Sequence, residues 1–366
     1  MKITVVTCYE SNEERAGFVY DACFSRGYDV NVITTDFSHI RKTKRESYPK
    51  GFMAISANEY NKNLSVSRIR SHQKFAKDAF GKVEELDPDL IWLMAPANSL
   101  IKEARQYKEK HPEKKIIIDI IDMWPESLPV KINKGILPFR VWKNVRKENI
   151  NCADLVVSEC DFYKDILKNE YQGKIDTIHW ARDSEAVIND LEVDDEKLHL
   201  CYIGSINNII DTEKIAQIIA DINMPVVLHI IGEGENTEHF LGTVKKVCEV
   251  EYYGAIRNEE EKSRIFRKCH AGINIYKENL YIGLTVKCID YFEHGLPIIN
   301  NIKGDTWKLV EEYKAGINVD DNTVVDGNEL IKMRKDNQNI FDLYNKFFTK
   351  EVFVVKCHKA IDEVMK

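Results

Sequence analysis

Residues 198–231 read LHLCYIGSINNIIDTEKIAQIIADINMPVVLHII, and their pattern indicates the class of fold. Two short apolar runs, Leu198–Ile203 and Val226–Ile231, flank an amphipathic segment at Thr212–Ala220. Short strands that are apolar throughout, joined by a helix, are typical of a parallel sheet covered on both faces. We therefore expect a doubly wound α/β fold, in which ligands bind at the carboxyl ends of the strands.

The same alternation of strand and helix patterns runs through the rest of the chain. The further expected strands are Lys2–Thr7, Asp29–Thr35, Asp89–Met94, Lys115–Ile121, Val250–Tyr253, Gly272–Tyr276 and Pro297–Asn300. The expected helices are Asn12–Arg26, Ser67–Leu86, Ser99–Lys110, Glu238–Cys248, Glu259–Lys268 and Val286–Glu293. Between the halves, 183–197 is polar and acidic without a clear period, as a linker is. The prediction is two Rossmann-like domains, 1–182 and 198–347, facing a central cleft.

Composition narrows the functional classes. The 366 residues are 44% hydrophobic and 30% charged, which excludes collagen-like, low-complexity and largely disordered chains. No apolar run approaches the ~20 residues of a membrane helix. A strand pattern begins at Lys2, so no signal peptide is expected. The nine cysteines never show Cys-x-x-Cys spacing, which favours thiols in a reducing cytoplasm over a disulfide or zinc framework.

Charge differs between the two halves. Residues 1–182 hold 30 Lys+Arg and 26 Asp+Glu (+4), whereas residues 183–366 hold 22 and 33 (−11). Basic residues gather in 41–50 and 61–70, which fits either a solvated loop or a peripheral contact with an anionic membrane. Nucleic acid is not an expected partner, because the chain is acidic overall and has no recognised binding motif.

Two strand-to-loop junctions in the second half carry chemistry. Gly204 and Ser205 directly follow an apolar strand, where backbone N–H groups can cradle a phosphate; the plainer interpretation is a strand-ending glycine. Further on, Lys287 lies in the first turn of an expected helix. A cation there is unfavourable unless an anion lies nearby. Asp290, three residues later on the same helix face, can accept hydrogen bonds from ribose hydroxyls or simply form an ion pair with Lys287.

The order of these motifs resembles the donor domain of retaining GT-B glycosyltransferases, and within them a bacterial polysaccharide branch of family four. The resemblance rests on the Gly-Ser loop, Ile-Ile-Gly-Glu-Gly at 230–234, Tyr-Tyr-Gly-Ala-Ile at 252–256, Cys-His-Ala-Gly-Ile-Asn-Ile at 269–275 and Lys-x-x-Asp-Tyr-Phe-x-x-Gly-x-Pro at 287–297. In the first half, 119–127 resembles the Asp-x-Trp-Pro-Glu-Ser segment of N-acetylhexosaminyltransferase-like members, and 153–158 resembles the strand that follows it. The resemblance also implies that a final helix, 348–366, packs back on the first domain.

The resemblance implies a nucleotide-sugar donor, with a UDP-sugar expected, and a saccharide or polyprenyl-linked glycan as acceptor. Lys287 and Asp122 would be the catalytic-site residues, Lys287 neutralising the diphosphate and Asp122 positioning the acceptor or the sugar. The implied donor-binding residues are Gly204, Ser205, Gly254, Ile256, Arg257, Glu278, Gly283, Leu284, Thr285 and Asp290. The implied acceptor-binding residues are Glu13, Arg15 and Trp124, although Trp124 fits core packing equally well.

The sequence departs from the family pattern at several positions. The first acid of the family's Glu-x7-Glu motif falls on Ile282, and Glu278 is the candidate substitute in a different register. Ile206–Asn208 replaces the basic residues that often follow the Gly-Ser loop, so Arg15 or Arg182 would have to assist Lys287. A histidine that many members carry is Ile121 here.

The expected mechanism is metal-independent hexosyl transfer with retention of configuration, in surface polysaccharide assembly, without a cofactor or a protein nucleophile. The sequence has no Asp-x-Asp motif in a donor-binding loop. Two other functions remain open: a nucleotide-sugar 2-epimerase of the same fold, and an inactive glycosyltransferase-like partner protein. The expected location is the cytoplasm, with a peripheral position on the inner face of the membrane as a variant.

Overall fold

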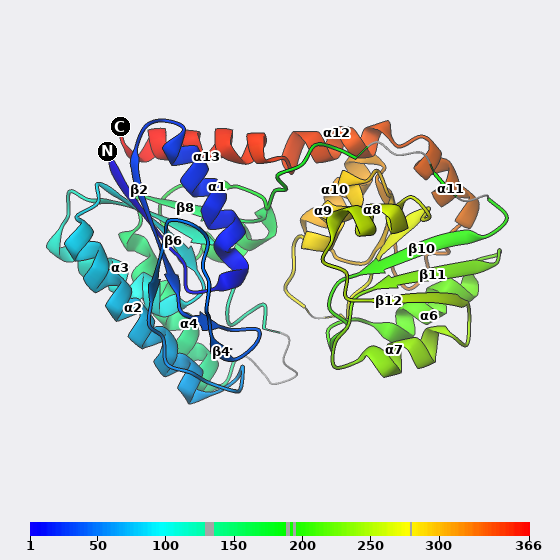
Figure 1. Ribbon diagram of the computed structural model, residues 1–366, viewed down its shortest axis with the longest axis horizontal. Helices are drawn as coiled ribbons and strands as arrows, with labels where there is room; N and C mark the ends of the chain where they lie inside the picture. Colours follow the sequence, from blue (N-terminus) through cyan, green and yellow to red (C-terminus); the bar gives the residue numbers. More distant parts are fainter. Residues whose placement is uncertain (129–134, 188–190, 193–194, 279) are drawn as a thin grey trace. The chain divides into compact units, whose positions relative to one another are not determined.

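The first sheet is parallel throughout and has seven strands in the order β5-β2-β1-β6-β7-β8-β9 (Figure 1). The computed structural model describes residues 1–128, 135–187, 191–192, 195–278 and 280–366. The strands of this sheet are β1 (Lys2–Val6), β2 (Asp29–Thr35), β5 (Phe52–Ile55), β6 (Leu90–Ala95), β7 (Lys115–Ile120), β8 (Leu155–Ser158) and β9 (Ile175–Thr177). The chain progresses outward in one direction through β1, β2 and β5 and in the other from β6 to β9. The direction reverses between β1 and β6.

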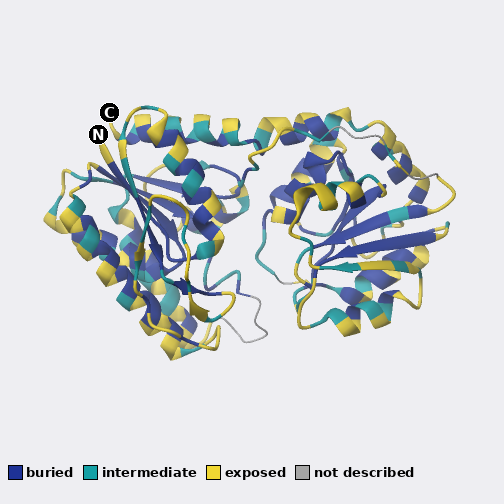
Figure 2. Ribbon diagram, in the orientation of Figure 1, coloured by how far each residue is buried: buried dark blue, intermediate teal, exposed yellow. Residues whose placement is uncertain are grey.

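Helices cover both faces of this sheet. On one face α2 (Val66–Leu86), α3 (Asn98–Lys110) and α4 (Leu137–Asn149) lie side by side, and on the other α1 (Glu13–Phe24) packs against α13 (Lys350–Val364) (Figure 1). Coverage on both faces explains why the central strand β6 is apolar along its whole length, with all six of its residues buried. Figure 2 shows the buried interior of the sheet. This unit also contains β3 (Phe37–Ser38), β4 (Thr43–Lys44), α5 (Lys164–Leu167) and three short 3-10 helices, Glu10–Asn12, Ile150–Cys152 and Asp161–Tyr163.

The second sheet repeats this winding with six parallel strands in the order β12-β11-β10-β13-β14-β15. They are β10 (Leu198–Ile203), β11 (Val226–Ile231), β12 (Glu249–Gly254), β13 (Ala271–Asn274), β14 (Ile298–Asn300) and β15 (Gly316–Asn318). Its helices are α6 (Thr212–Asp221), α7 (Thr237–Val244), α8 (Glu259–Phe266), α9 (Val286–Glu293), α10 (Asp305–Tyr313), α11 (Gly327–Lys335) and α12 (Gln338–Phe347). Helices α6 and α7 lie together on one face, and α9, α10 and α12 on the other.

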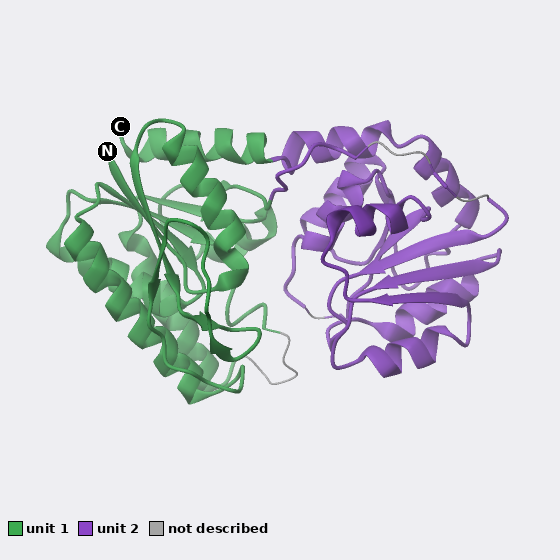
Figure 3. Ribbon diagram, viewed as in Figure 1, with its two compact units in different colours: residues 1–180, 350–366 green, residues 181–349 purple. Residues whose placement is uncertain are grey.

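The chain divides into two compact units, one formed by residues 1–180 with 350–366 and the other by residues 181–349 (Figure 3). Described residues of the expected linker, 183–197, are bonded to the second unit. The Val187 N–H donates to the Glu293 carbonyl (2.8 Å), and the Glu192 N–H donates to the Arg267 carbonyl (2.9 Å). The chain therefore changes unit near residues 180 and 350.

The prediction of two doubly wound parallel-sheet units is confirmed, and the expected strands at 198–203 and 226–231 coincide with β10 and β11. The sequence pattern missed the edge strands β5, β9 and β15, which span only four, three and three residues, none of them buried. Among the described helices, none combines the length and the hydropathy that crossing a membrane requires.

Candidate functional site

The order of strands in the second sheet reverses direction between β10 and β13, and the loops at its carboxyl edge diverge there. After β10 the chain winds outward through β11 and β12, and it then returns to place β13 on the other side of β10. Loops that follow two such strands diverge, so the reversal point leaves room for a ligand in doubly wound folds. The residues singled out in the sequence as Gly204 and Lys287 follow these two strands.

Three glycines stand in a row along this edge, one at the end of each of β10, β11 and β12. The Gly204 N–H donates to the Ile231 carbonyl (2.9 Å), and the Gly232 N–H donates to the Gly254 carbonyl (2.7 Å). Gly204 and Gly232 have φ of 120° and 143°, which favours glycine. A Cβ atom on Gly232 would lie 2.0 Å from the Gly204 carbonyl oxygen. The close approach of these two loops therefore requires glycine at residue 232.

Ser205 offers a free backbone donor in the loop after β10. Its carbonyl accepts a hydrogen bond from the Tyr202 hydroxyl (2.8 Å), and the next residue, Ile206, donates its N–H to the Glu233 carbonyl (3.1 Å). Both contacts hold the loop in place. The Ser205 residue itself is exposed, and within the described ranges its N–H has no acceptor.

Helix α9 is anchored to the sheet by the buried Tyr291. The Tyr291 hydroxyl donates to the Cys201 carbonyl (3.0 Å) and accepts from the Ile203 N–H (3.0 Å), so it bonds directly to β10. The ring lies over Gly272 of β13, where a Cβ atom would be 2.5 Å from it. Lys287 lies one turn earlier on the same face of α9. Tyr291 therefore directs Lys287 toward the carboxyl end of β10.

Lys287 is a buried cation without a polar partner. The Lys287 residue is only 8% exposed, and its Nζ forms no hydrogen bond to any residue that the structure describes. The Nζ lies 4.1 Å from the ring centroid of Tyr202 and 5.0 Å from that of Tyr276. A Cβ atom placed on Gly204 would lie 3.5 Å from Lys287 Cε, which puts the ammonium beneath the glycine loop. Burial lowers the pKa of Lys287 from 10.5 to about 7.

The structure separates Asp290 from Lys287. The Arg182 guanidinium donates from Nε to Asp290 Oδ1 (2.8 Å), and its second nitrogen lies 2.7 Å from the same oxygen. The ordinary Lys–Asp pair considered from the sequence is therefore not formed. Arg182 binds Asp290 instead, so Lys287 Nζ has no ion-pair partner among the described residues.

The other predicted donor residues have mixed surroundings. The Gly283 carbonyl accepts from the Thr306 N–H (2.9 Å), Leu284 is buried, and the Thr285 hydroxyl bonds to Asn274 Oδ1 (2.9 Å) at the start of α9. Gly254 bonds to Gly232 as described above. Ile256, Arg257 and Glu278 lie in loops, with Arg257 and Glu278 exposed, and no contact between described residues joins these three to Lys287.

In the first unit, Asp122 fixes the orientation of Trp124. The Trp124 indole N–H donates to Asp122 Oδ2 (2.6 Å), and the Ser127 hydroxyl donates to Oδ1. Burial raises the pKa of the Asp122 carboxyl above its ordinary value. Trp124 itself is half-buried. The two residues predicted near the acceptor therefore act as one unit after β7.

An aromatic cluster surrounds Trp124, and the sequence did not reveal it. Its members come from separate segments: Tyr9, His39, Tyr60, His72 and Trp142. The buried Arg68 guanidinium lies 4.3 Å from the Trp124 ring centroid. The Tyr9 hydroxyl bonds to His72 Nε2 (2.8 Å), and burial lowers the pKa of His39 to about 3 and that of His72 well below its ordinary value. These imidazoles are neutral at pH 7 and form an uncharged wall.

Glu159, which directly follows β8 at the carboxyl end of that strand, is another residue that the sequence analysis did not single out. It accepts a hydrogen bond from the Trp180 indole N–H (2.5 Å). Burial, followed by the nearby Asp122 carboxylate, raises the pKa of Glu159 to about 8. Its carboxyl is therefore largely protonated at neutral pH, which limits the negative charge beside Asp122.

Two predicted acceptor residues have structural roles instead. Arg15 is fully buried, and its guanidinium binds Asp119 through Nε (2.8 Å) and a second nitrogen (2.9 Å), and the carbonyls of Ile178 and His179. Glu13 is held by Arg45 (2.5 and 2.8 Å) and by the Thr34 hydroxyl (2.6 Å). The polar atoms of Arg15 and Glu13, predicted at an acceptor site, are therefore engaged within the fold. For the same reason Arg15 cannot assist Lys287.

Metal ligation has no obvious place in this part of the chain. Within the described residues, no three His, Cys, Asp or Glu side chains are grouped so that they could hold a metal ion.

Comparison with known proteins identifies the fold. No protein-family model matches the sequence, and no curated protein matches it. Solved structures do. Sucrose-phosphate synthase from Thermosynechococcus elongatus is similar with a TM-score of 0.74 at 13% identity, covering 100% of this chain and 99% of that one. The lipopolysaccharide galactosyltransferase WaaB has a TM-score of 0.68 at 13% identity, covering 99% of each chain.

A third similar structure is HepE from Anabaena in complex with UDP-glucose, with a TM-score of 0.63 at 11% identity and 99% of each chain covered. At these identities the likeness concerns the fold. The chain has the GT-B fold, with two parallel-sheet α/β units of the kind found in these glycosyltransferases.

Proposed function

We propose that this protein is a glycosyltransferase that takes a sugar from a nucleotide-sugar donor, with a UDP-sugar as the expected donor. The observation that carries the proposal is Lys287, a buried ammonium with no polar partner, beneath the Gly204 loop at the reversal point of the second sheet. An unpaired buried charge is costly, so its retention indicates a ligand of opposite charge. A diphosphate bound at this point would supply that charge.

The donor site would combine three kinds of contact. Lys287 would bind the diphosphate with charge-assisted hydrogen bonds, and the Ser205 N–H would add a backbone donor. Asp290, oriented by Arg182, would accept hydrogen bonds from the ribose. The loop after β12, with Gly254, Ile256 and Arg257, would receive the nucleobase, and Gly283 to Thr285 and Glu278 would approach the sugar.

The chemistry follows from where charge develops. As the bond to the sugar breaks, negative charge grows on the leaving diphosphate, and a preorganised ammonium with backbone N–H groups stabilises it. No protein nucleophile or metal is assigned to this step. We propose that it is a hexosyl transfer with retention of configuration. Asp122, which orients Trp124, would position the acceptor, a saccharide or polyprenyl-linked glycan of surface polysaccharide assembly.

A panel of nucleotide sugars tests this function. We expect UDP-sugars to raise the melting temperature of the protein, and one of them to be hydrolysed slowly to UDP in the absence of acceptor, with and without EDTA. Interconversion of two sugars would instead identify an epimerase. Stabilisation without hydrolysis or transfer would identify an inactive partner protein, and no response to any donor would reject the proposed site.

Donor binding should depend on pH through Lys287. Because the pKa of Lys287 is about 7, the ammonium is lost as pH rises above that value, and the bound anion favours the charged form. Affinity for UDP-glucose should be nearly constant below pH ~7 and fall by up to about tenfold per pH unit above it. Binding near pH 8 should take up protons, which calorimetry in buffers of different ionisation enthalpy measures.

The two phosphates of UDP-glucose remain ionised across this range, so proton uptake would report a group of the protein. Binding that is independent of pH, with no proton uptake, would contradict the assignment of Lys287 to the diphosphate.

A further inference from the structure

Helices α2 and α4 of the first unit expose apolar side chains at their first turns. The large aliphatic side chains that are 40–72% exposed in this region are Leu64, Val66, Ile69, Ile136, Leu137 and Val141. They account for six of the fifteen large apolar side chains exposed in the described ranges, although these segments are short. Singly exposed aliphatic residues need no explanation, but a concentration of them marks an interaction surface.

The two helices display the same outward stripe. In α2 it consists of Val66, Ile69, Arg70 and Gln73, all exposed. In α4 it consists of Leu137, Arg140, Val141 and Asn144, all exposed. Each stripe begins with an aliphatic residue and has an amide seven positions later. Between them, one aliphatic residue and one arginine occupy the third and fourth positions, in opposite order in the two helices. Residues at this spacing share one face of a helix.

The beginnings of α2 and α4 lie on two sides of Trp124. Arg68 of α2 places its guanidinium 4.3 Å from the Trp124 ring centroid, and the ring of Trp142 in α4 lies 5.7 Å from the ring of Trp124. Helix α3 packs against both helices. The two stripes therefore belong to one end of the same three-helix layer, which we term the α2–α4 surface.

The charge of this surface is positive and uncompensated. Its exposed cations are Lys62, Arg70, Arg140 and Lys147, and none of them forms an ion pair with another described residue. The sequence has no Asp or Glu at 60–77 or at 127–147. Any partner of this surface must therefore accept aliphatic side chains and neutralise cations.

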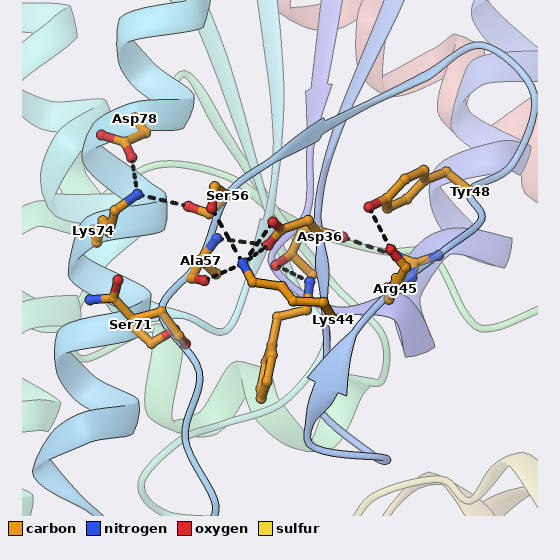
Figure 4. Close-up of polar contacts among 12 residues, drawn as sticks. Asp36, Lys44, Arg45, Tyr48, Ser56, Ala57, Ser71, Lys74 and Asp78 are labelled. Atoms are coloured by element: carbon orange, nitrogen blue, oxygen red, sulfur yellow. Dashed lines mark hydrogen bonds and ion pairs between the residues drawn. The ribbon is translucent and has the colours of Figure 1, made fainter.

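Part of the basic loop at 41–50, which the sequence singled out, is engaged within the fold. Lys44 binds Asp36 (2.7 Å) and the Ala57 carbonyl (2.7 Å), and the nearby Lys74 of α2 binds Asp78 (2.7 Å) (Figure 4). Arg45 binds Glu13 (2.5 Å). Lys44, Arg45 and Lys74 are therefore engaged inside the first unit, whereas Arg41 and Lys50 of the loop are exposed and form no ion pair with a described residue.

We propose that the α2–α4 surface binds the interface of an anionic lipid bilayer, with Val66, Ile69, Leu137 and Val141 inserted among the headgroups and the flanking cations on lipid phosphates. Helices with aliphatic and basic residues on one face bind in this way, and each cation near an anionic leaflet adds to the attraction. A second copy of this chain fits less well, because a two-fold interface would place these cations against one another. The proposal is independent of the donor site.

Vesicle co-sedimentation tests the proposal. We expect the protein to bind vesicles of phosphatidylcholine with phosphatidylglycerol and to bind pure phosphatidylcholine vesicles weakly. The double variant Leu137→Ser/Val141→Ser should lower the partition coefficient by about tenfold or more, since it removes two inserted side chains. Arg70→Gln and Arg140→Gln should each lower it by about fivefold and weaken its dependence on salt.

Matched controls come from the same unit. Val355→Ser on α13 removes a 65% exposed aliphatic side chain, and Lys77→Gln removes an exposed cation near the middle of α2; neither should change vesicle binding. All variants should bind UDP-glucose as the parent protein does. A protein that binds vesicles but no nucleotide sugar would reject the proposed function and leave this surface assignment standing.

Three results would overturn the assignment. They are no binding to anionic vesicles, equal binding by Leu137→Ser/Val141→Ser and the parent protein, and a dimer in sedimentation velocity that this double variant dissociates. The last result would assign the surface to a second copy of the chain.

Discussion

Replacing Lys287 with methionine should abolish measurable donor use while making the free protein more stable at pH 7. The ammonium lies beneath the Gly204 loop, so its loss would remove charge-assisted bonds to the diphosphate. Affinity for UDP-glucose should fall about 10- to 100-fold, and donor hydrolysis or transfer by about 10²–10³-fold. Methionine has nearly the shape of lysine and keeps the contacts with Tyr202 and Tyr276.

The stability effect has the opposite sign to the functional effect. The folded-state pKa of Lys287 is about 7, whereas its ordinary value is 10.5, so the unfolded chain binds more protons between these values. The free energy of unfolding therefore rises with pH across that interval, and the cost of burying the charge is fully present below pH ~7. Lys287→Met removes this cost, so its melting temperature should exceed that of the parent protein at neutral pH.

Melting curves and calorimetric titrations of the two proteins measure both effects, with Lys308→Met, an exposed lysine of α10, as the control. A Lys287→Met protein that is less stable and binds UDP-glucose normally would show that the lysine is structural.

Removing the carboxylate of Asp119 should strongly destabilise the first unit, because it leaves Arg15 charged and unpaired in the core. Both residues are fully buried, and the Trp92 indole N–H also donates to Asp119 (3.1 Å). Breaking a buried ion pair from one side costs about 3–5 kcal/mol, so Asp119→Ala should lower the stability of this unit by about that amount. Urea unfolding followed by circular dichroism measures it.

A double variant distinguishes a structural from a ligand-binding role. Arg15→Met/Asp119→Leu replaces both charges with apolar side chains of similar size, and such exchanges are often neutral or stabilising. We expect it to regain most of the stability lost in Asp119→Ala. If Asp119→Ala were as stable as the parent protein but lost acceptor use, Arg15 would belong to the acceptor site after all.

The sequence predicted elements whose signal is local. Strands β10 and β11 and helix α6 appear at the expected residues, because runs of apolar residues and helical periodicity are properties of neighbouring positions. Lys287, which carries the proposed anion site, could be singled out for a similar reason: a cation in the first turn of a helix after a strand is a local anomaly. Its neighbour Ser205 was predicted from a glycine that directly follows a strand.

Such local patterns could not predict ion pairs between residues that lie far apart in the sequence. Arg15 looked like an available cation because its partner Asp119 lies 104 residues away in the sequence. The Lys287–Asp290 spacing suggested a pair, but Arg182, 108 residues from Asp290, takes that carboxylate. The cluster around Trp124 draws its rings from five further segments, none of which is unusual by itself. Only the fold brings these residues together.

The central claim is that Lys287 and the loop after β10 bind the diphosphate of a nucleotide sugar. A crystal structure of the protein with UDP tests it most directly. The account predicts the diphosphate within hydrogen-bond distance of Lys287 Nζ and the Ser205 N–H, with the ribose at Asp290. A nucleotide bound elsewhere, with Lys287 Nζ still unpaired beneath Gly204, would contradict it.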